Sequence, residues 1–228
     1  MLIELIKDIF FSKPIAPILL PVKDSSVNSV LNVGGGTKAT PIPPHYEGWH
    51  HHLLDIDPRG APDIVCDARL LTSLPGHCYD AIYCSHNLEH YYRHDGLNVV
   101  QGFVHMLNDT GFAEIRVPDI ALVMQALRER QLEVDDVLYV SPAGPISAHD
   151  ILYGLQTEIV DSGQDFYAHK TGFTPKSLVK ILTDGGFKKI YLVNDEAFAV
   201  HAFAFKTDPT LDQRARLGKS WQLAVTAS

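Results

Sequence analysis

The stretch SVLNVGGG, residues 29–36, decides the fold, because a short apolar run passes directly into Gly34, Gly35 and Gly36. The run does not alternate between apolar and polar residues, which is typical of a strand covered on both faces in a parallel sheet. Glycines after such a strand allow a ligand to approach the backbone N–H groups without a Cβ in the way. The sequence therefore predicts a first parallel strand that ends at a binding site.

Similar apolar runs recur along the chain, and each predicts a further strand. They are residues 53–56, 64–66, 81–84, 111–117, Lys189–Val193 and 198–205. The turn between the last two runs is too short for a crossover, so these two strands form an antiparallel hairpin. Helical spacing of apolar residues fills the gaps between the runs, as in Ile120–Arg130 behind its N-cap Asp119. The predicted fold is α/β, a doubly wound, mostly parallel, seven-stranded Rossmann-like sheet with a C-terminal antiparallel hairpin.

Four segments depart from this alternation of strands and helices. Prolines at 41, 43 and 44 disfavour the usual long helix between the first two strands. Residues 131–172 form a long irregular insertion of the kind that often acts as a lid. Residues 1–28 are interpreted as an amphipathic segment packed on the main domain (29–206), and residues 207–228 as a loose tail.

Composition excludes several classes of protein. Lys plus Arg number 19 against 27 Asp plus Glu, a formal charge of −8, which argues against general nucleic-acid binding. Cys66, Cys78 and Cys84 show no metal-binding or disulfide pattern, so we expect a reducing, cytoplasmic environment. No apolar run reaches the length of a transmembrane segment. The oligomeric state stays open, with a homodimer among the alternatives.

An acid at the end of the second strand points to a nucleoside ligand. Asp55 follows Gly34 at a distance that suits an acceptor for both hydroxyls of an adenosine ribose. Asp67 and Ala68, after the third strand, are positioned to meet the exocyclic amine of adenine. The run GGGTKA also fits a dinucleotide-binding pattern, but a pyrophosphate requires a helix N-terminus that the prolines disfavour.

The order of motifs LNVGGG, DIDP, DIVCDA, YDAIYCSHNLEH, RVPD and HKTGF resembles the class I S-adenosylmethionine-dependent methyltransferases. It is most similar to a small bacterial type 11-like group, and the resemblance covers about residues 29–206. It implies a Rossmann-like methyltransferase fold, S-adenosylmethionine as cofactor, and methyl transfer to an oxygen or nitrogen of a small or glycan-like acceptor.

The resemblance also implies roles for individual residues. The expected cofactor-binding residues are Asn32, Gly34, Gly35, Gly36, Asp55, Ile56, Asp67, Ala68 and Ser85. Because the donor methyl group is already electrophilic, catalysis needs in-line positioning of the acceptor and, for a hydroxyl, a general base. The candidates for this base are His86, His149 and His169, since histidine titrates near neutral pH.

Other functions remain open at this point. Gly35, Lys38 and the run LNDTG at 107–111 depart from the family pattern, so the domain could instead be a cofactor-binding or interaction module with little turnover. A nicotinamide-dependent enzyme is a weaker alternative. The run HNLEH at 86–90 matches the inverted zinc-hydrolase motif, but no third ligand is evident in the sequence, so no metal site is expected.

Overall fold

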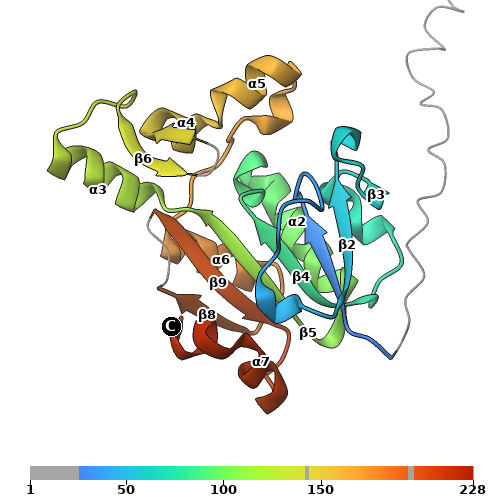
Figure 1. Cartoon of the computed structure of the whole chain (residues 1–228). Helices are drawn as coiled ribbons and strands as arrows, with labels where there is room; N and C mark the ends of the chain where they lie inside the picture. Colours follow the sequence, from blue (N-terminus) through green and yellow to red (C-terminus); the bar gives the residue numbers. More distant parts are fainter. Residues whose placement is uncertain (1–25, 142–143, 195–197, 228) are drawn as a thin grey trace, which may run out of the picture.

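An eight-stranded sheet forms the centre of the chain in the computed structural model, which describes residues 26–141, 144–194 and 198–227 (Figure 1). The expected amphipathic segment lies outside the described residues except for its last three positions. The order of strands across the sheet is β10-β8-β9-β5-β4-β1-β2-β3. The strands are β1 (Ser29–Val33), β2 (His50–Asp55), β3 (Ile64–Val65), β4 (Tyr79–Ser85), β5 (Leu107–Pro118), β8 (Lys189–Val193), β9 (Ala199–Phe205) and β10 (Ala224–Thr226).

The parallel half of the sheet contains β1 to β5, and β1 lies at its centre. All five residues of β1 are buried, and the strand pairs in parallel with both β2 and β4. Burial on both faces explains the absence of alternation in SVLNV. The strand order reverses at β1, between β2 and β4, and ligands bind at such switch points, outside the carboxyl ends of the strands. The predicted α/β fold is therefore confirmed, and a binding site at the end of the first strand stays a prediction.

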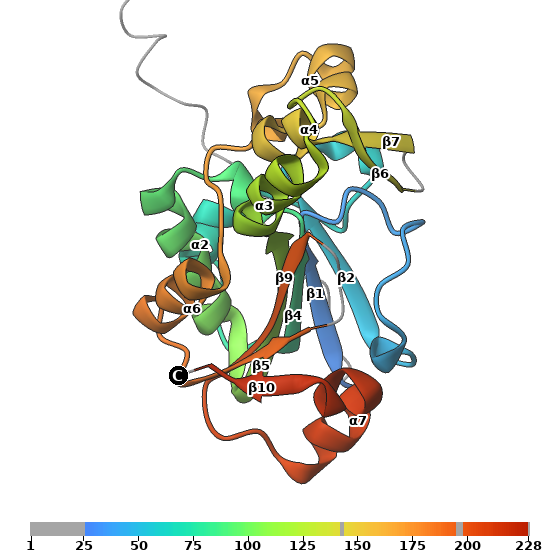
Figure 2. The same cartoon turned by 90° about the vertical axis from the view of Figure 1, so that its left-hand side faces the viewer.

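One face of the sheet is covered by helices that follow β3, β4 and the lid. They are the 3-10 helix η3 (Ala68–Ser73), α2 (Arg93–Met106) and α6 (Pro175–Asp184) (Figure 2). Thr174 caps α6 in a capping box, and Pro175 occupies its first turn. The large buried side chains of this face include Leu31, Phe103 and Phe187, which form the main core.

On the opposite face, the described residues form no comparable row of helices. It is covered by α7 (Leu211–Gln222) and by the proline-rich loop, in which η1 (Pro44–Tyr46) is a single 3-10 turn. Glu114 of β5 anchors this loop from below, since its Oε2 lies 2.8 Å from His45 Nε2. Glu114 Oε1 lies 3.1 Å from both Arg116 Nη2 and His201 Nε2. A buried carboxylate thus holds the loop where the usual helix is missing.

The C-terminal region differs from the expected loose tail. Residues 211–222 form α7 behind a capping box at Thr210, and β10 then pairs antiparallel with β8. The sheet consequently has eight strands rather than the expected seven. The expected antiparallel hairpin is present as β8 and β9, and β9 lies between β8 and β5. Trp221 packs on Tyr191 and Phe205, so apolar contacts hold the segment in place.

Residues 131–172 are here called the lid. Their described part, 131–141 and 144–172, is folded rather than irregular and lies beyond the carboxyl ends of the parallel strands (Figure 1). The lid contains the β6-β7 hairpin, two short helices and a 3-10 turn, and α3 packs against it. These elements are α3 (Ile120–Arg130), β6 (Val137–Ser141), β7 (Gly144–Ser147), α4 (Ala148–Tyr153), α5 (Gln156–Ser162) and η5 (Asp165–Tyr167). A small core of its own, including Val123, Leu138 and Ile151, stabilises this region. Among the described residues, no helix has both the length and the apolar character needed to cross a bilayer.

Candidate functional site

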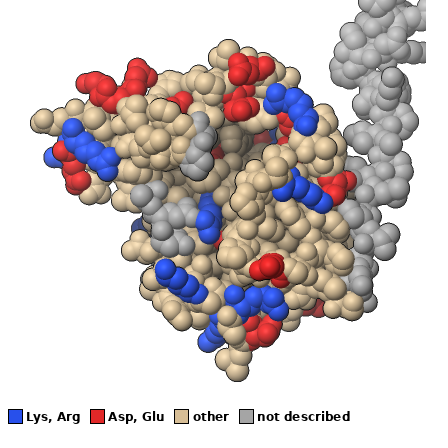
Figure 3. All heavy atoms as spheres, viewed as in Figure 1, with Lys and Arg blue, Asp and Glu red and all other residues tan. Residues whose placement is uncertain are grey.

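A cavity of about 480 Å³ opens between the carboxyl ends of the parallel strands and the lid. Figure 3 shows the surface hollowed between these two parts, with acidic and basic side chains interspersed on the face drawn. The glycine loop, the ends of β2 and β3, the segment after β4 and the lid all contribute to the wall. Pockets of about 300–1,000 Å³ are typical of small-ligand sites, so the cavity is large enough for a nucleoside and part of an acceptor.

Asp55 and the glycine loop form the floor of the cavity. Asp55 is 8% exposed, and its Oδ2 accepts a hydrogen bond from the Gly36 backbone N–H at 2.9 Å. Its Oδ1 accepts from the Asp57 N–H at 2.9 Å. Each carboxylate oxygen has a second lone pair, so both can still accept from a ligand. Gly34 and Gly36 have φ values of 73° and 67°, a conformation that L side chains rarely adopt.

Asn87 occupies the space beside Gly34 at the cavity wall. A Cβ on Gly34 would collide with the Asn87 side chain, so the glycine is required for this close approach. Asn87 Oδ1 is buried and, among the described residues, accepts no hydrogen bond. A buried acceptor without a donor is costly, and a ligand N–H group could satisfy it.

Gly35 and Asn32 lie outside the cavity lining and pack against each other. A Cβ on Gly35 would collide with the Asn32 side chain, which is 2% exposed beneath it. The absence of a side chain at Gly35 therefore makes room for this amide. Neither residue lines the cavity, and neither does Ser85. Of the residues expected to bind the cofactor, Gly34 and Gly36 are brought together at the cavity, and Asn32, Gly35 and Ser85 do not line it.

Asp67 lines the cavity, but its carboxylate already has a partner. Arg69 Nη2 donates to Asp67 Oδ2 at 2.6 Å, and Arg69 Nε donates to the same oxygen at 2.9 Å. Burial alone would raise the pKa of Asp67, but the hydrogen bonds from Arg69 bring the pKa below its usual value. Ile56 lines the cavity and is 39% exposed, whereas Ala68 is buried in the core outside the wall. Arg69 itself lines the cavity and was not expected from the sequence.

Two of the three candidate histidines reach the cavity. His86 and His169 line it. His86 has a φ of 51°, and strained backbone of this kind clusters at functional sites. His149 does not line it, because its ring packs on Tyr153 with centroids 5.0 Å apart at the start of α4. The structure therefore does not bring His149 together with the other two candidate histidines at the cavity.

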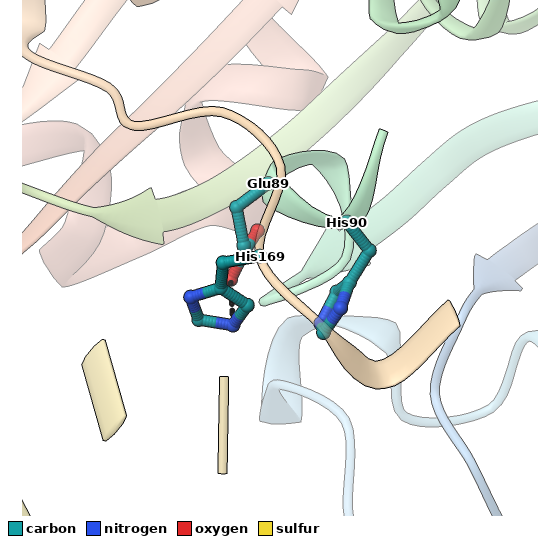
Figure 4. Close-up of side chains that lie close together, drawn as sticks. All are labelled: Glu89, His90 and His169. Carbon is teal, nitrogen blue, oxygen red and sulfur yellow. Dashed lines mark ion pairs between the residues drawn. The ribbon is translucent and has the colours of Figure 1, made fainter. Parts of the chain in front are cut away.

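The HNLEH segment does not form the helix that a zinc-hydrolase motif requires. Residues 88–90 are a single 3-10 turn, η4 (Leu88–His90), and His86 precedes it at positive φ. His90 instead faces His169 of the lid, with ring centroids 4.7 Å apart, and Glu89 lies beside both (Figure 4). Burial alone would raise the pKa of Glu89, but the surrounding histidines, His86 first, lower it. The grouping joins segments far apart in the sequence, so sequence order carried no signal for it.

A polar latch connects the lid to the loop after β2. Tyr167 Oη donates to Asp57 Oδ2 at 2.6 Å and accepts from Arg59 Nη2 at 2.9 Å. Arg59 Nε also donates to Asp57 Oδ2 at 2.7 Å. The hydrogen bond from Arg59, assisted by Tyr167, lowers the pKa of Asp57 to about 2. Tyr167 of the latch lines the same cavity as Asp55.

We expect Tyr167→Phe to loosen the lid without unfolding the domain. The change removes both hydrogen bonds of the phenolic oxygen, which contribute about 0.5–1.5 kcal/mol each. Hydrogen exchange of α5 and η5, followed by mass spectrometry, should become faster. Tyr153→Phe, at an exposed lid tyrosine outside the latch, serves as the control. Because the Asp57 pKa is depressed, the latch is fully formed above about pH 4 and weakens as pH falls toward 2. Unchanged exchange in Tyr167→Phe would contradict the latch.

Solved structures of other proteins share the fold of this chain. No family model matches the chain, and no curated protein matches it in sequence. A SAM-dependent methyltransferase from Archaeoglobus fulgidus has a similar structure, with a TM-score of 0.50 and 16% identity over 79% of this chain and 86% of that one. The PH0226 protein from Pyrococcus horikoshii OT3 is similar at a TM-score of 0.52, with 13% identity over 79% and 84% of the two chains. Taken with the strand order and the site at its switch point, these likenesses give the chain the fold of the class I S-adenosylmethionine-dependent methyltransferases.

Proposed function

We propose that this chain transfers a methyl group from S-adenosylmethionine to an oxygen or nitrogen of a small or glycan-like acceptor. The observation that carries the proposal is the cavity at the strand switch point, with Asp55 and the glycine loop in its floor. The methyltransferase fold supports the same reading, although fold alone does not determine chemistry.

The residues in the floor fit this cofactor. Gly36 has a φ of 67°, and apart from its chain neighbours no atom lies within 4 Å of the point that a Cβ would occupy, so its backbone is open to the cavity. Asp55 would accept from the ribose hydroxyls, and Asn87 Oδ1 would accept from the ammonium of the methionine end. Asp67, neutralised by Arg69, would meet the adenine edge. S-adenosylmethionine, when bound, supplies an electrophilic methyl group.

The other residues of the wall would act on the acceptor. His86 would hold the acceptor hydroxyl or amine and accept its proton, and the Glu89 carboxylate, 3.5 Å from His86 Nδ1, would orient the ring and stabilise its charge. Lys170 lines the same wall and lies 5.8 Å from the centre of the Tyr92 ring. An ammonium group beside an aromatic ring suits an acceptor with hydroxyls and an anionic group. The lid would exclude water from this volume.

We expect Asp55→Ala to weaken binding of S-adenosylmethionine by about 1–3 kcal/mol, because ribose hydroxyls lose their acceptor. Isothermal titration of the purified chain with S-adenosylmethionine and S-adenosylhomocysteine measures the effect. Asp55→Asn, which keeps the side-chain shape that supports Gly36, separates loss of the carboxylate from collapse of the loop. Asp184→Ala, at an exposed position on α6, is the control. Equal affinity in Asp55→Ala and the parent would show that the ribose lies elsewhere.

The same titration distinguishes catalysis from a binding module. Methyl transfer to a member of a panel of hydroxylated and aminated small molecules, followed by S-adenosylhomocysteine release, supports the enzyme. Tight cofactor binding without release on any acceptor would favour the cofactor-binding module. Binding of neither cofactor form would exclude the enzyme and the cofactor-binding module and would leave an interaction module.

A further inference from the structure

We propose that Glu89, His90 and His169 form a binding site for a divalent transition-metal ion at the acceptor side of the cavity. One ligand atom of each residue lies within 4.8 Å of the others, and all three residues line the cavity (Figure 4). Two imidazoles and one carboxylate are a recurrent donor set for zinc and for non-haem iron. Among the described residues, these three are the set of His, Cys, Asp or Glu side chains that lie close enough together to share one metal ion.

His169 and Glu89 lie too far apart for a direct hydrogen bond, and the three ligand atoms would have to move closer together to bind one ion. An ion with bonds of about 2.0–2.2 Å holds its ligand atoms about 3–3.5 Å apart. His169 Nε2 lies 4.0 Å from Glu89 Oε1, too far for a hydrogen bond. Small rotations of the side chains would bring the ligand atoms to the required spacing.

The donor atoms have the buried, unsatisfied character expected of ligands. Glu89 is 1% exposed, and neither of its carboxylate oxygens has a hydrogen bond of good geometry among the described residues. His90 Nδ1 is buried and likewise without a hydrogen-bond partner there, while its ring hydrogen-bonds the Ala168 backbone. Such groups are costly when left without partners, and an ion would satisfy the Glu89 carboxylate and His90 Nδ1 together.

His169 shows the supporting contact that metal-binding histidines usually have. Its Nδ1 lies 2.7 Å from the carbonyl oxygen of Ile151. A carbonyl only accepts, so Nδ1 carries the proton and Nε2 presents its lone pair toward Glu89. An N–H donated to a backbone carbonyl fixes both the tautomer and the ring orientation of a ligand histidine.

The backbone fixes the two halves of the site relative to each other. The N–H groups of Lys170 and Thr171 donate to the Glu89 carbonyl oxygen at 2.8 and 3.1 Å. Thr171 Oγ1 also donates to the Tyr91 carbonyl at 2.8 Å. The segment that carries His169 is therefore held against η4, which lowers the entropic cost of assembling three ligands from distant segments.

An ion at this position would have a role in the proposed reaction. Three protein ligands leave coordination positions open toward the cavity, where an acceptor oxygen could bind. Coordination favours the deprotonated form of a hydroxyl, and His86 would take the released proton. This role rests on the proposed methyl transfer, whereas metal binding itself does not.

The test is isothermal titration of ZnCl₂ into the tag-free, chelator-treated full chain, with MgCl₂ as a hard-cation comparison. We expect one equivalent of Zn²⁺ to bind and Mg²⁺ to bind far more weakly. His169→Ala and Glu89→Gln should each weaken Zn²⁺ binding by at least about tenfold. His149→Ala, at a lid histidine outside the cluster, is the matched control and should bind like the parent. Circular dichroism of each variant checks that it is folded, and His169→Gln provides a second substitution that keeps polarity.

Two results would overturn the site. One is the absence of Zn²⁺ binding by the parent chain. The other is binding that survives His169→Ala and Glu89→Gln but is lost when His50, His51 and His52 are all replaced with alanine, which would locate the ion at β2. A separate titration of S-adenosylmethionine into the same metal-free protein tests the proposed methyl transfer independently of the metal site. Cofactor binding without Zn²⁺ binding removes the metal site alone, and Zn²⁺ binding without cofactor binding removes the proposed methyl transfer alone.

Discussion

Replacing His86 with alanine should lower turnover by about 10²–10⁴-fold at saturating cofactor, with little change in cofactor affinity. The ring lines the cavity directly after β4, and Glu89 Oε1 lies 3.5 Å from its Nδ1. A base oriented by a buried carboxylate follows the usual arrangement of an activated proton acceptor. Turnover is measured as S-adenosylhomocysteine release with an acceptor from the panel described above.

His149→Ala is the matched control, because it removes an imidazole from the lid at a position outside the cavity. We expect it to retain the turnover of the parent chain. His86→Gln should be as slow as His86→Ala, since an amide cannot accept a proton at neutral pH. If His86→Ala and His149→Ala turn over alike, the general base is not His86.

Replacing Glu114 with leucine should destabilise the domain by about 3–5 kcal/mol, the usual cost of removing one partner of a buried ionic network. Glu114 is 0% exposed, and its two oxygens are the acceptors for His45, His201 and Arg116. Without it, these donors stay buried with one acceptor fewer, and the proline-rich loop loses its anchor. Urea unfolding followed by tryptophan fluorescence measures the change in the free energy of unfolding.

The pH dependence of the free energy of unfolding tests the contribution of Glu114 independently. Burial alone would raise the pKa of Glu114, but hydrogen bonds from His201 and His45 lower it far below its usual value of 4.5. The contribution of Glu114 is therefore fully present above about pH 4.5 and is lost as pH falls below it. Glu114→Leu should show a flatter stability profile between about pH 5 and 3.

The control for Glu114→Leu is Glu129→Leu, at an exposed position of α3, which should change stability by less than about 0.5 kcal/mol. A similar small change in Glu114→Leu would mean that the loop is held by its apolar contacts.

The sequence predicted those parts of the fold that local patterns encode. The continuous apolar run of β1 and the cap at Asp119, which begins α3, both carry their own signals. β10 carries none, because its three residues become a strand only when β8 offers backbone partners. The lid hairpin was missed for a related reason, since the small core beneath it is assembled from α3, β6, β7 and α4 rather than from one periodic segment.

The candidate site likewise contains residues that local sequence patterns identify and residues that only tertiary contacts bring together. Gly34, Gly36 and Asp55 follow directly from the ends of strands, where the chain geometry alone determines the position of the side chain or backbone. His86 follows directly from the end of a strand, whereas the positions of His149 and His169 depend on how the lid folds, so the sequence did not separate these two. The contact between His90 and His169 and the latch at Tyr167 join distant segments, and only the folded structure reveals them.

The short β10 strand has a consequence for handling the protein. β10 covers the outer side of β8 through pairs such as Val225 with Leu192. Deleting residues 207–228 would leave a row of backbone donors and acceptors on β8 without partners, next to the aromatic surface that Trp221 now shields. Exposed rows of this kind template edge-to-edge association between molecules. A version shortened to residues 29–206 should therefore self-associate and precipitate, even though every residue that lines the cavity is still present.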